Sequence, residues 1–184
     1  MRVLGIDPGS ETTGWGVVEG DRNGQSYRLI EYGAVKLSSS ATFSSRLLKI
    51  SRALEEVIGR LQPTACAIEE AFYSVNPKVT LKLGQVRGVA LLAAEAAALE
   101  IGEYAPRLVK QTVAGYGNAE KQQVQQMVRV LLSLKAVPEP HDAADALAVA
   151  ICHFHHAGAN QRLLAAETHQ SLPSKVAAAT RRRA

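Results

Sequence analysis

Cysteine and long apolar runs are both scarce in this sequence, and each shortage excludes a class of protein. Cys66 and Cys152 are the only cysteines, too few for a scaffold held by disulfides, and we expect two free, buried thiols. The Ala- and Leu-rich stretch Val89–Leu99 is too short to cross a bilayer and contains Glu95. The first apolar run is broken by Asp7, unlike the core of a signal peptide. We therefore expect a cytoplasmic protein with no membrane partner.

Charge is unevenly distributed along the chain. Residues 158–184 carry five Lys or Arg against one acid, whereas residues 1–157 carry sixteen of each. Within this neutral body, residues 104–135 hold five Lys or Arg against Glu120 alone. A basic face of this kind suits a nuclease, although charge alone fits many proteins. The length and the charge pattern predict one domain over residues 1–157 and a basic, flexible tail over residues 158–184.

The first ten residues predict a short buried strand that ends on a carboxylate. Val3, Leu4 and Ile6 suit a strand inside a sheet, and Pro8 and Gly9 then stop it. Asp7 becomes the last strand residue, at the carboxyl edge of the sheet. Open α/β sheets bind their ligands at that edge.

The rest of the chain predicts an α/β fold with a mixed sheet flanked by helices. Two further strands joined by turns, up to Leu37, complete a three-stranded antiparallel meander. Helical spacing up to Leu61 and a following apolar run, residues 65–68, predict a crossover to a parallel strand. Later segments predict a helix over about residues 78–99, a fifth strand over 101–105, a helix from Pro106 to Val113, a helix capped by Asn118, and a last helix over 141–156.

Acids from separate segments are candidates for one metal site. The parallel strand ends on Glu69 and Glu70, so one of them should lie near Asp7. Asp142 and Asp145 share one face of the last helix, although complementing the helix dipole would also explain this pair. Carboxylates that converge without cations repel one another, and a divalent metal relieves that repulsion. Our hypothesis is a metal site for phosphodiester cleavage.

Several stretches together resemble one known family. They are LGIDPGSETTGWGVV, AIEEAFYSVNP, LKLGQVRGVAL, VKQTVAGYGNAEKQQVQ and DAADALAVAICH, in this order over about residues 3–155. They resemble the RuvC-type Holliday junction resolvases, which are RNase H-like nucleases. The resemblance implies an RNase H-like fold with a five-stranded mixed sheet, and paired symmetric, metal-dependent cleavage of four-way junctions in recombination and repair.

The resemblance also implies roles for particular residues. It selects Glu69 over Glu70. It implies that four acids are catalytic residues and also bind one or two Mg²⁺ ions, for which Mn²⁺ can substitute. These acids are Asp7, Glu69, Asp142 and Asp145. Lys110 and Lys121 match basic residues that face the scissile phosphate. Phe72 matches an aromatic residue that touches junction bases, and burial under its own loop is the alternative. We add Tyr73, Lys78 and Arg107 as further DNA contacts. Some relatives carry histidine where Asp142 stands, and the preceding His141 is more simply explained by capping or exposure than by metal binding.

The partners implied by the resemblance are four-way junction DNA, a second copy of the chain, and a branch-migration motor with a junction-binding subunit. A protein with such DNA-bound partners is expected at the nucleoid. The Gly- and Ala-rich helix around residues 83–98 is our candidate for the dimer interface. His153, His155 and His156 have no ligand spacing with the acids, and we assign them to helix surface and core.

Two other functions remain as alternatives. Residues 7–12 also resemble the first phosphate loop of actin-like ATPases and sugar kinases, but the second, Asp-Gly-Gly loop of those proteins is missing from this sequence. A non-catalytic binder of branched DNA would keep the fold and lose the acids, whereas all four acids and both lysines are present here.

Overall fold

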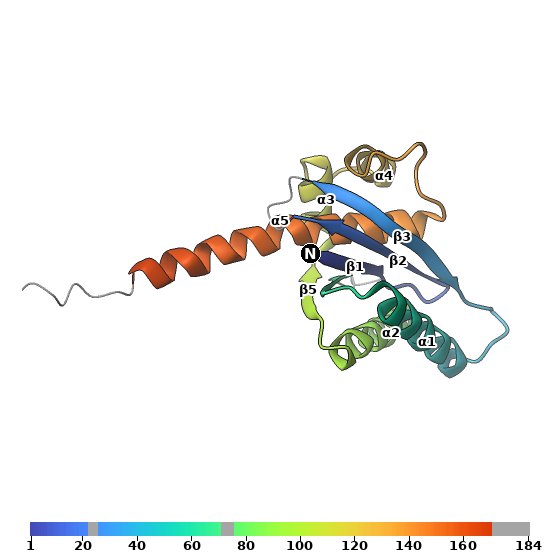
Figure 1. Cartoon of the computed structure of the whole chain (residues 1–184). Helices are drawn as coiled ribbons and strands as arrows, with labels where there is room; N and C mark the ends of the chain where they lie inside the picture. Colours follow the sequence, from blue (N-terminus) through green and yellow to red (C-terminus); the bar gives the residue numbers. More distant parts are fainter. Residues whose placement is uncertain (22–25, 71–75, 171–184) are drawn as a thin grey trace, which may run out of the picture.

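The computed structural model describes residues 1–21, 26–70 and 76–170, with side chains up to residue 157. Figure 1 shows a central sheet with α1 and α2 on one side and α3, α4 and α5 on the other. The elements are β1 (Arg2–Asp7), β2 (Thr12–Gly20), β3 (Tyr27–Lys36), α1 (Phe43–Leu61), β4 (Ala65–Glu69), α2 (Pro77–Ala96), β5 (Glu100–Tyr104), α3 (Pro106–Ala114), α4 (Lys121–Leu131) and α5 (His141–Gln170).

The sheet has five strands in the order β3-β2-β1-β4-β5. The pairs β1–β2 and β2–β3 are antiparallel, and the pairs β1–β4 and β4–β5 are parallel. The predicted meander and parallel crossover are both confirmed. β1 is therefore the central strand, and its last residue, Asp7, lies at the edge where β4 and β5 also end.

Alternation along β1 divides the interior into two cores. Val3 packs with α3, α4 and α5 in one core, whereas Leu4 and Ile6 pack with α1 and α2 in the other. Successive strand side chains point to opposite faces, so Asp7 points to the same face as Val3, toward α5. Every residue of β1 from Val3 to Ile6 is buried, as expected for a strand covered on both sides.

Glycines in the sheet let α5 pack unusually close to it. A Cβ atom at Gly5 would lie 2.0 Å from the carbonyl oxygen of Ala146, and one at Gly14 would lie 1.9 Å from that of Asp142. Any side chain at these positions would therefore push the helix away. Gly14 pairs with Asp7 across β1 and β2, so this packing brings the first turn of α5 to the end of β1.

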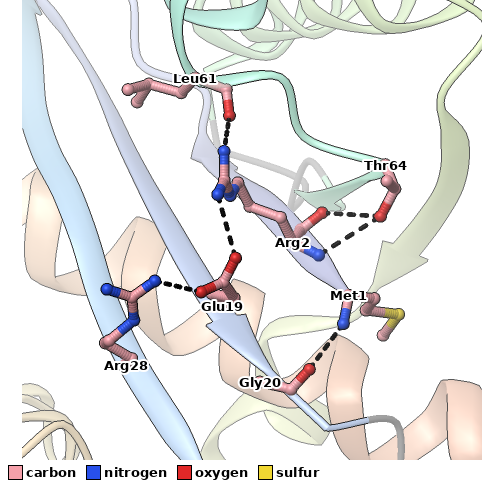
Figure 2. Close-up of polar contacts among 7 residues, drawn as sticks. All are labelled: Met1, Arg2, Glu19, Gly20, Arg28, Leu61 and Thr64. Carbon is pink, nitrogen blue, oxygen red and sulfur yellow. Dashed lines mark hydrogen bonds and ion pairs between the residues drawn. The ribbon is translucent and has the colours of Figure 1, made fainter.

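The other end of β1 is fixed by polar contacts (Figure 2). The Arg2 guanidinium donates to the carbonyl oxygen of Leu61 at 2.5 Å and to Glu19 Oε1 at 3.0 Å. Glu19 also pairs with Arg28, and the Met1 ammonium group donates to a carbonyl oxygen of β2. These contacts tie β1, β2, β3 and the end of α1 together. They lie opposite the edge that carries Asp7.

Two predictions differ from the structure in their boundaries. The last helix ends at Gln170 and not at His156, so it extends past the sheet (Figure 1). The predicted cap Asn118 is wrong, because α4 begins at Lys121 and Glu120 caps it. The Glu120 side chain accepts from the backbone of Gln123, whose side chain accepts from the Glu120 N–H at 2.8 Å, and this reciprocal pair fixes the helix start.

Both cysteines are free and buried, as predicted. Of the helices in the described part of the chain, none is both long and apolar enough to cross a bilayer.

Candidate active site

Two strand ends supply the first two acids of the site. Ile6 of β1 pairs with Ile68 of β4, so the residues that follow, Asp7 and Glu69, lie side by side at the carboxyl edge. Ala67 packs in the core beneath α5, so alternation also directs Glu69 toward that helix. The next residue, Glu70, follows the end of β4, and its backbone N–H donates to the carbonyl oxygen of Tyr104 in β5. The geometry thus separates two acids that are adjacent in the sequence.

The first turns of α5 bring the second pair of acids to the same edge. The charges of Asp145 and Asp142 both act on Asp7, in that order of strength after Glu69. Asp145 lines a cavity of 280 Å³ together with Asp7, Glu69, Lys110 and Lys121. Among the described residues, Asp142 is not part of this lining. Three of the four predicted acids and both predicted lysines therefore meet in one cavity, with Asp142 beside it.

Burial and neighbouring negative charge favour the protonated forms of Asp7 and Glu69. Burial and, after it, the charges of Glu69, Asp145 and Asp142 together raise the pKa of Asp7 to about 8, against a smaller opposing effect of Lys121. Burial and then the charge of Asp145 raise the pKa of Glu69, although its hydrogen bond with Asp7 acts in the opposite direction. At neutral pH the metal-free site therefore keeps a proton between these two carboxylates. A cation would replace that proton.

Helix α4 contacts Asp145 through two residues one turn apart. Lys121 Nζ lies 2.5 Å from Asp145 Oδ2, and Gln125 Nε2 donates to Asp145 Oδ1 at 3.4 Å. Burial lowers the pKa of Lys121, but its hydrogen bond with Asp145 and the surrounding acidic charges outweigh this, and the net shift is upward. Gln125 was not among the site residues predicted from the sequence. Its position four residues after Lys121, on the same helix face, was the available signal.

A second cavity, of 200 Å³, lies on the other side of the two strand ends. Asp7 and Glu69 line it as well, together with Glu70 and Arg87. Arg87 reaches it from α2 and pairs with Glu103 of β5. The two strand-end acids thus separate one cavity that contains lysines from another that contains an arginine.

The remaining predicted site residues lie apart from the acids or outside the described residues. Lys78 is exposed in the first turn of α2, and Arg107 is exposed on α3. Phe72 and Tyr73 lie outside the described residues, so the structure does not test them. His141 is exposed and lines a different cavity, of 690 Å³, together with Tyr116 and glutamines of α4.

The three predicted surface or core histidines of α5 each have a hydrogen-bond partner. His153 contacts the Tyr104 hydroxyl at 2.9 Å, His155 contacts Tyr27 and His156 contacts Thr112. These contacts join α5 to β3, β5 and α3, and they give the histidines a structural role.

The donor chemistry of the acidic cavity fits a hard divalent cation. Its acidic side chains offer carboxylate oxygens, which are the ligands that Mg²⁺ and Mn²⁺ prefer. Among the described residues, no group of three or more His, Cys, Asp or Glu stands ready to hold a metal as the side chains lie. The ion pair of Lys121 with Asp145 gives a physical reason, because an ammonium group already engages one of the carboxylates.

The chain is similar to proteins of one family over most of its length. The family model described as crossover junction endodeoxyribonuclease RuvC matches residues 3–153. The crossover junction endodeoxyribonuclease RuvC of Chloroflexus aggregans is 51% identical over 162 residues, which are 88% of this chain and 98% of the relative. That of Caldanaerobacter subterraneus is 50% identical over 163 residues, 89% of this chain and 98% of the relative.

A solved structure of the same kind also superposes on this one. The structure of Thermus thermophilus RuvC in complex with a Holliday junction substrate gives a TM-score of 0.80 at 38% identity. The match covers 87% of this chain and 96% of that chain. The similarity therefore extends through the strands and helices that form the acidic cavity.

Proposed function

This chain belongs to the RuvC family of crossover junction endodeoxyribonucleases, and we propose that the acidic cavity between β1, β4, α4 and α5 is where it cuts DNA. The chain is a nuclease with an RNase H-like fold that acts on Holliday junctions. The observation that supports this cavity most directly is the meeting of Asp7, Glu69 and Asp145 with Lys110 and Lys121 in one lining. The reaction is hydrolysis of a phosphodiester bond, and we propose that it occurs in recombination and repair, at the nucleoid.

We propose that the four acids hold one or two Mg²⁺ ions, for which Mn²⁺ can substitute. Asp7 and Glu69 would bind between the strand ends, and Asp145 and Asp142 would complete the site from α5. Bound there, the metal would supply the activation of a water molecule and the neutralisation of charge on the scissile phosphate. The raised pKa values of Asp7 and Glu69 support this assignment, since burial and the repulsion between the acids raise them, and a bound cation would offset both effects.

Lys110 and Lys121 are proposed to bind and orient the scissile phosphate. Both line the acidic cavity, and the charges of both act on Glu69. Lys121 can neutralise Asp145 in the free protein and turn to the phosphate when DNA arrives, because its side chain is 57% exposed. A cation that moves between these partners would stabilise the growing negative charge of the phosphate during cleavage.

The wider DNA contacts are proposed for exposed side chains outside the cavity lining. Lys78 and Arg107 are exposed and would contact backbone phosphates, which makes binding weaker as salt rises. Phe72 and Tyr73 precede α2 in the chain, and we propose that Phe72 stacks on an unpaired junction base.

A homodimer would give the two cuts that a four-way junction requires. Symmetric incision needs two active sites related by a two-fold axis. Leu81 and Leu92 of α2 are each 68% exposed, and Gly84 and Gly88 have open space around them. We propose that this side of α2 packs against a second copy, and that the dimer works with a branch-migration motor and a junction-binding subunit.

The deciding experiment is incubation of the protein with a mobile four-way junction and Mg²⁺ or Mn²⁺. Paired symmetric nicks are the expected result, and retention of uncut junction at every metal concentration would favour a non-catalytic binder. The Asp7→Asn variant should lose cutting and keep junction binding, because it removes a charge but conserves size. Loss of both would make Asp7 a structural residue and overturn its assignment.

A further inference from the structure

Helix α4 contacts Asp145 at both of its carboxylate oxygens. Lys121 Nζ lies 2.5 Å from Oδ2, and Gln125 Nε2 donates to Oδ1 at 3.4 Å. The two α4 residues are one helical turn apart, so they approach the carboxylate from the same helix face. The orientation of Asp145 in the metal-free protein is therefore set by α4 and not by α5 alone.

Gln125 differs from its partner in burial. Its side chain belongs to a residue that is only 4% exposed, between the buried Val124 and Val128, whereas Lys121 is 57% exposed. A buried amide is costly unless it has a hydrogen-bond partner, and Asp145 supplies one. Lys121 can leave the carboxylate for solvent or for DNA, whereas Gln125, at 4% exposure, would give up a hydrogen bond that solvent does not readily replace.

The two contacts also respond differently to a cation. A divalent ion on Asp145 would repel the Lys121 ammonium group, because both are positive. The Gln125 amide is neutral and donates to the other oxygen, so a cation on Oδ2 does not disturb it. A hydrogen bond to one oxygen of a ligating carboxylate orients the other toward the metal.

We propose that Gln125 is a positioning residue that holds Asp145 in the orientation needed to bind the catalytic metal when Lys121 moves away. This inference rests on the proposed function, because it takes Asp145 to be a metal ligand. Gln125 does not touch the substrate. It acts only through Asp145.

The test measures Mn²⁺ binding to the full chain without DNA, by titration calorimetry and by the rise in melting temperature. Gln125→Leu keeps the volume and removes the amide, so it should weaken Mn²⁺ binding by about tenfold or more. Gln122→Leu is the matched control, since Gln122 is an exposed glutamine of the same helix that does not contact Asp145. It should bind Mn²⁺ as the wild type does.

Junction cutting gives a second readout. Saturating Mn²⁺ should restore most of the rate of Gln125→Leu, because the loss lies in metal affinity. Gln125→Asn keeps an amide but is one methylene shorter, so it should show the same weakening, and it serves if the leucine variant fails to fold. Folded Gln125 variants that bind Mn²⁺ with wild-type affinity would overturn the inference. If the wild type itself neither binds Mn²⁺ nor cuts junctions, the proposed function fails instead.

Discussion

The carbonyl oxygen of Asp142 lies so close to Gly14 that a Cβ atom there would be 1.9 Å away. Gly14 is the antiparallel partner of Asp7, so this contact joins the start of α5 to the end of β1. The distance between the acids of the two elements therefore depends on a residue without a side chain.

Gly14→Ala should destabilise the protein and reduce cutting. Its methyl group would force α5 outward, and overpacking of this kind costs about 1–3 kcal/mol of unfolding free energy. Displacement of Asp142 and Asp145 should lower the cleavage rate even at temperatures where the variant is folded. Denaturant unfolding and junction cleavage measure the two effects. Gly59→Ala is the control, because that position on α1 has open space and the change should stabilise the helix by about 0.5–1 kcal/mol.

The stability of the metal-free protein should fall as pH rises from about 4 to about 8. The pKa of Asp7 is raised from 3.8 to about 8 in the folded state, so between these values the folded protein holds a proton that the unfolded chain has lost. The stabilising contribution of this proton is fully present below the unfolded-state pKa of 3.8, and it is lost as pH rises through the folded-state pKa of about 8. Thermal melts in the presence of a chelator measure it.

The Asp7→Asn variant should lose most of this pH dependence and melt at a higher temperature than the wild type near pH 8. Mg²⁺ competes with the proton, so its stabilising effect on the wild type should be larger above pH 8 than near pH 6. A wild-type melting temperature that is constant with pH in chelator would contradict the assigned proton.

Lys121→Ala should slow cleavage with little change in stability. It removes the cation that lies 2.5 Å from Asp145, and loss of one such group from a site costs about a hundredfold in rate. The lysine is more than half exposed, so its ion pair contributes less than about 1 kcal/mol to folding. Single-turnover cleavage at saturating protein measures the rate, with Lys135→Ala as an exposed control outside the cavity. A rate equal to that of the wild type would remove the role given to Lys121.

Leu92→Glu should convert a dimer into monomers. Leu92 is 68% exposed on α2, and a charge at the centre of an apolar interface should raise the dissociation constant by about thirtyfold or more. Analytical ultracentrifugation measures this, with Leu48→Glu on α1, where the leucine is 50% exposed, as the control. Monomers should cut junctions without pairing their nicks. A wild-type protein that is monomeric with or without junction DNA would end the dimer proposal.

Local sequence signals predicted a strand end correctly where the residues at that end determine it. The run that ends at Pro8 and Gly9 predicted a strand ending at Asp7, which is where β1 ends. The crossover to a parallel strand that ends on Glu69 or Glu70 was predicted in the same way, and β4 ends at Glu69. The start of α4 was predicted wrongly, because Asn118 is a favoured cap residue by type, whereas the residue that exchanges hydrogen bonds with Gln123 is Glu120.

Sequence alone determined that Asp7 ends one central strand and that the pair Glu69 and Glu70 ends the next, because a strand's pattern and its stop signals are local. Only the tertiary structure decided which acids line the cavity. Glu69 faces α5 and Glu70 does not, owing to the alternation of β4, and Asp145 enters the lining without Asp142. The contact of Gln125 with Asp145 also depends on the tertiary structure, because it exists only when α4 packs against α5. Contacts between elements far apart in the chain depend on how closely backbones can approach, and at Gly5 and Gly14 that approach is set by the missing side chains.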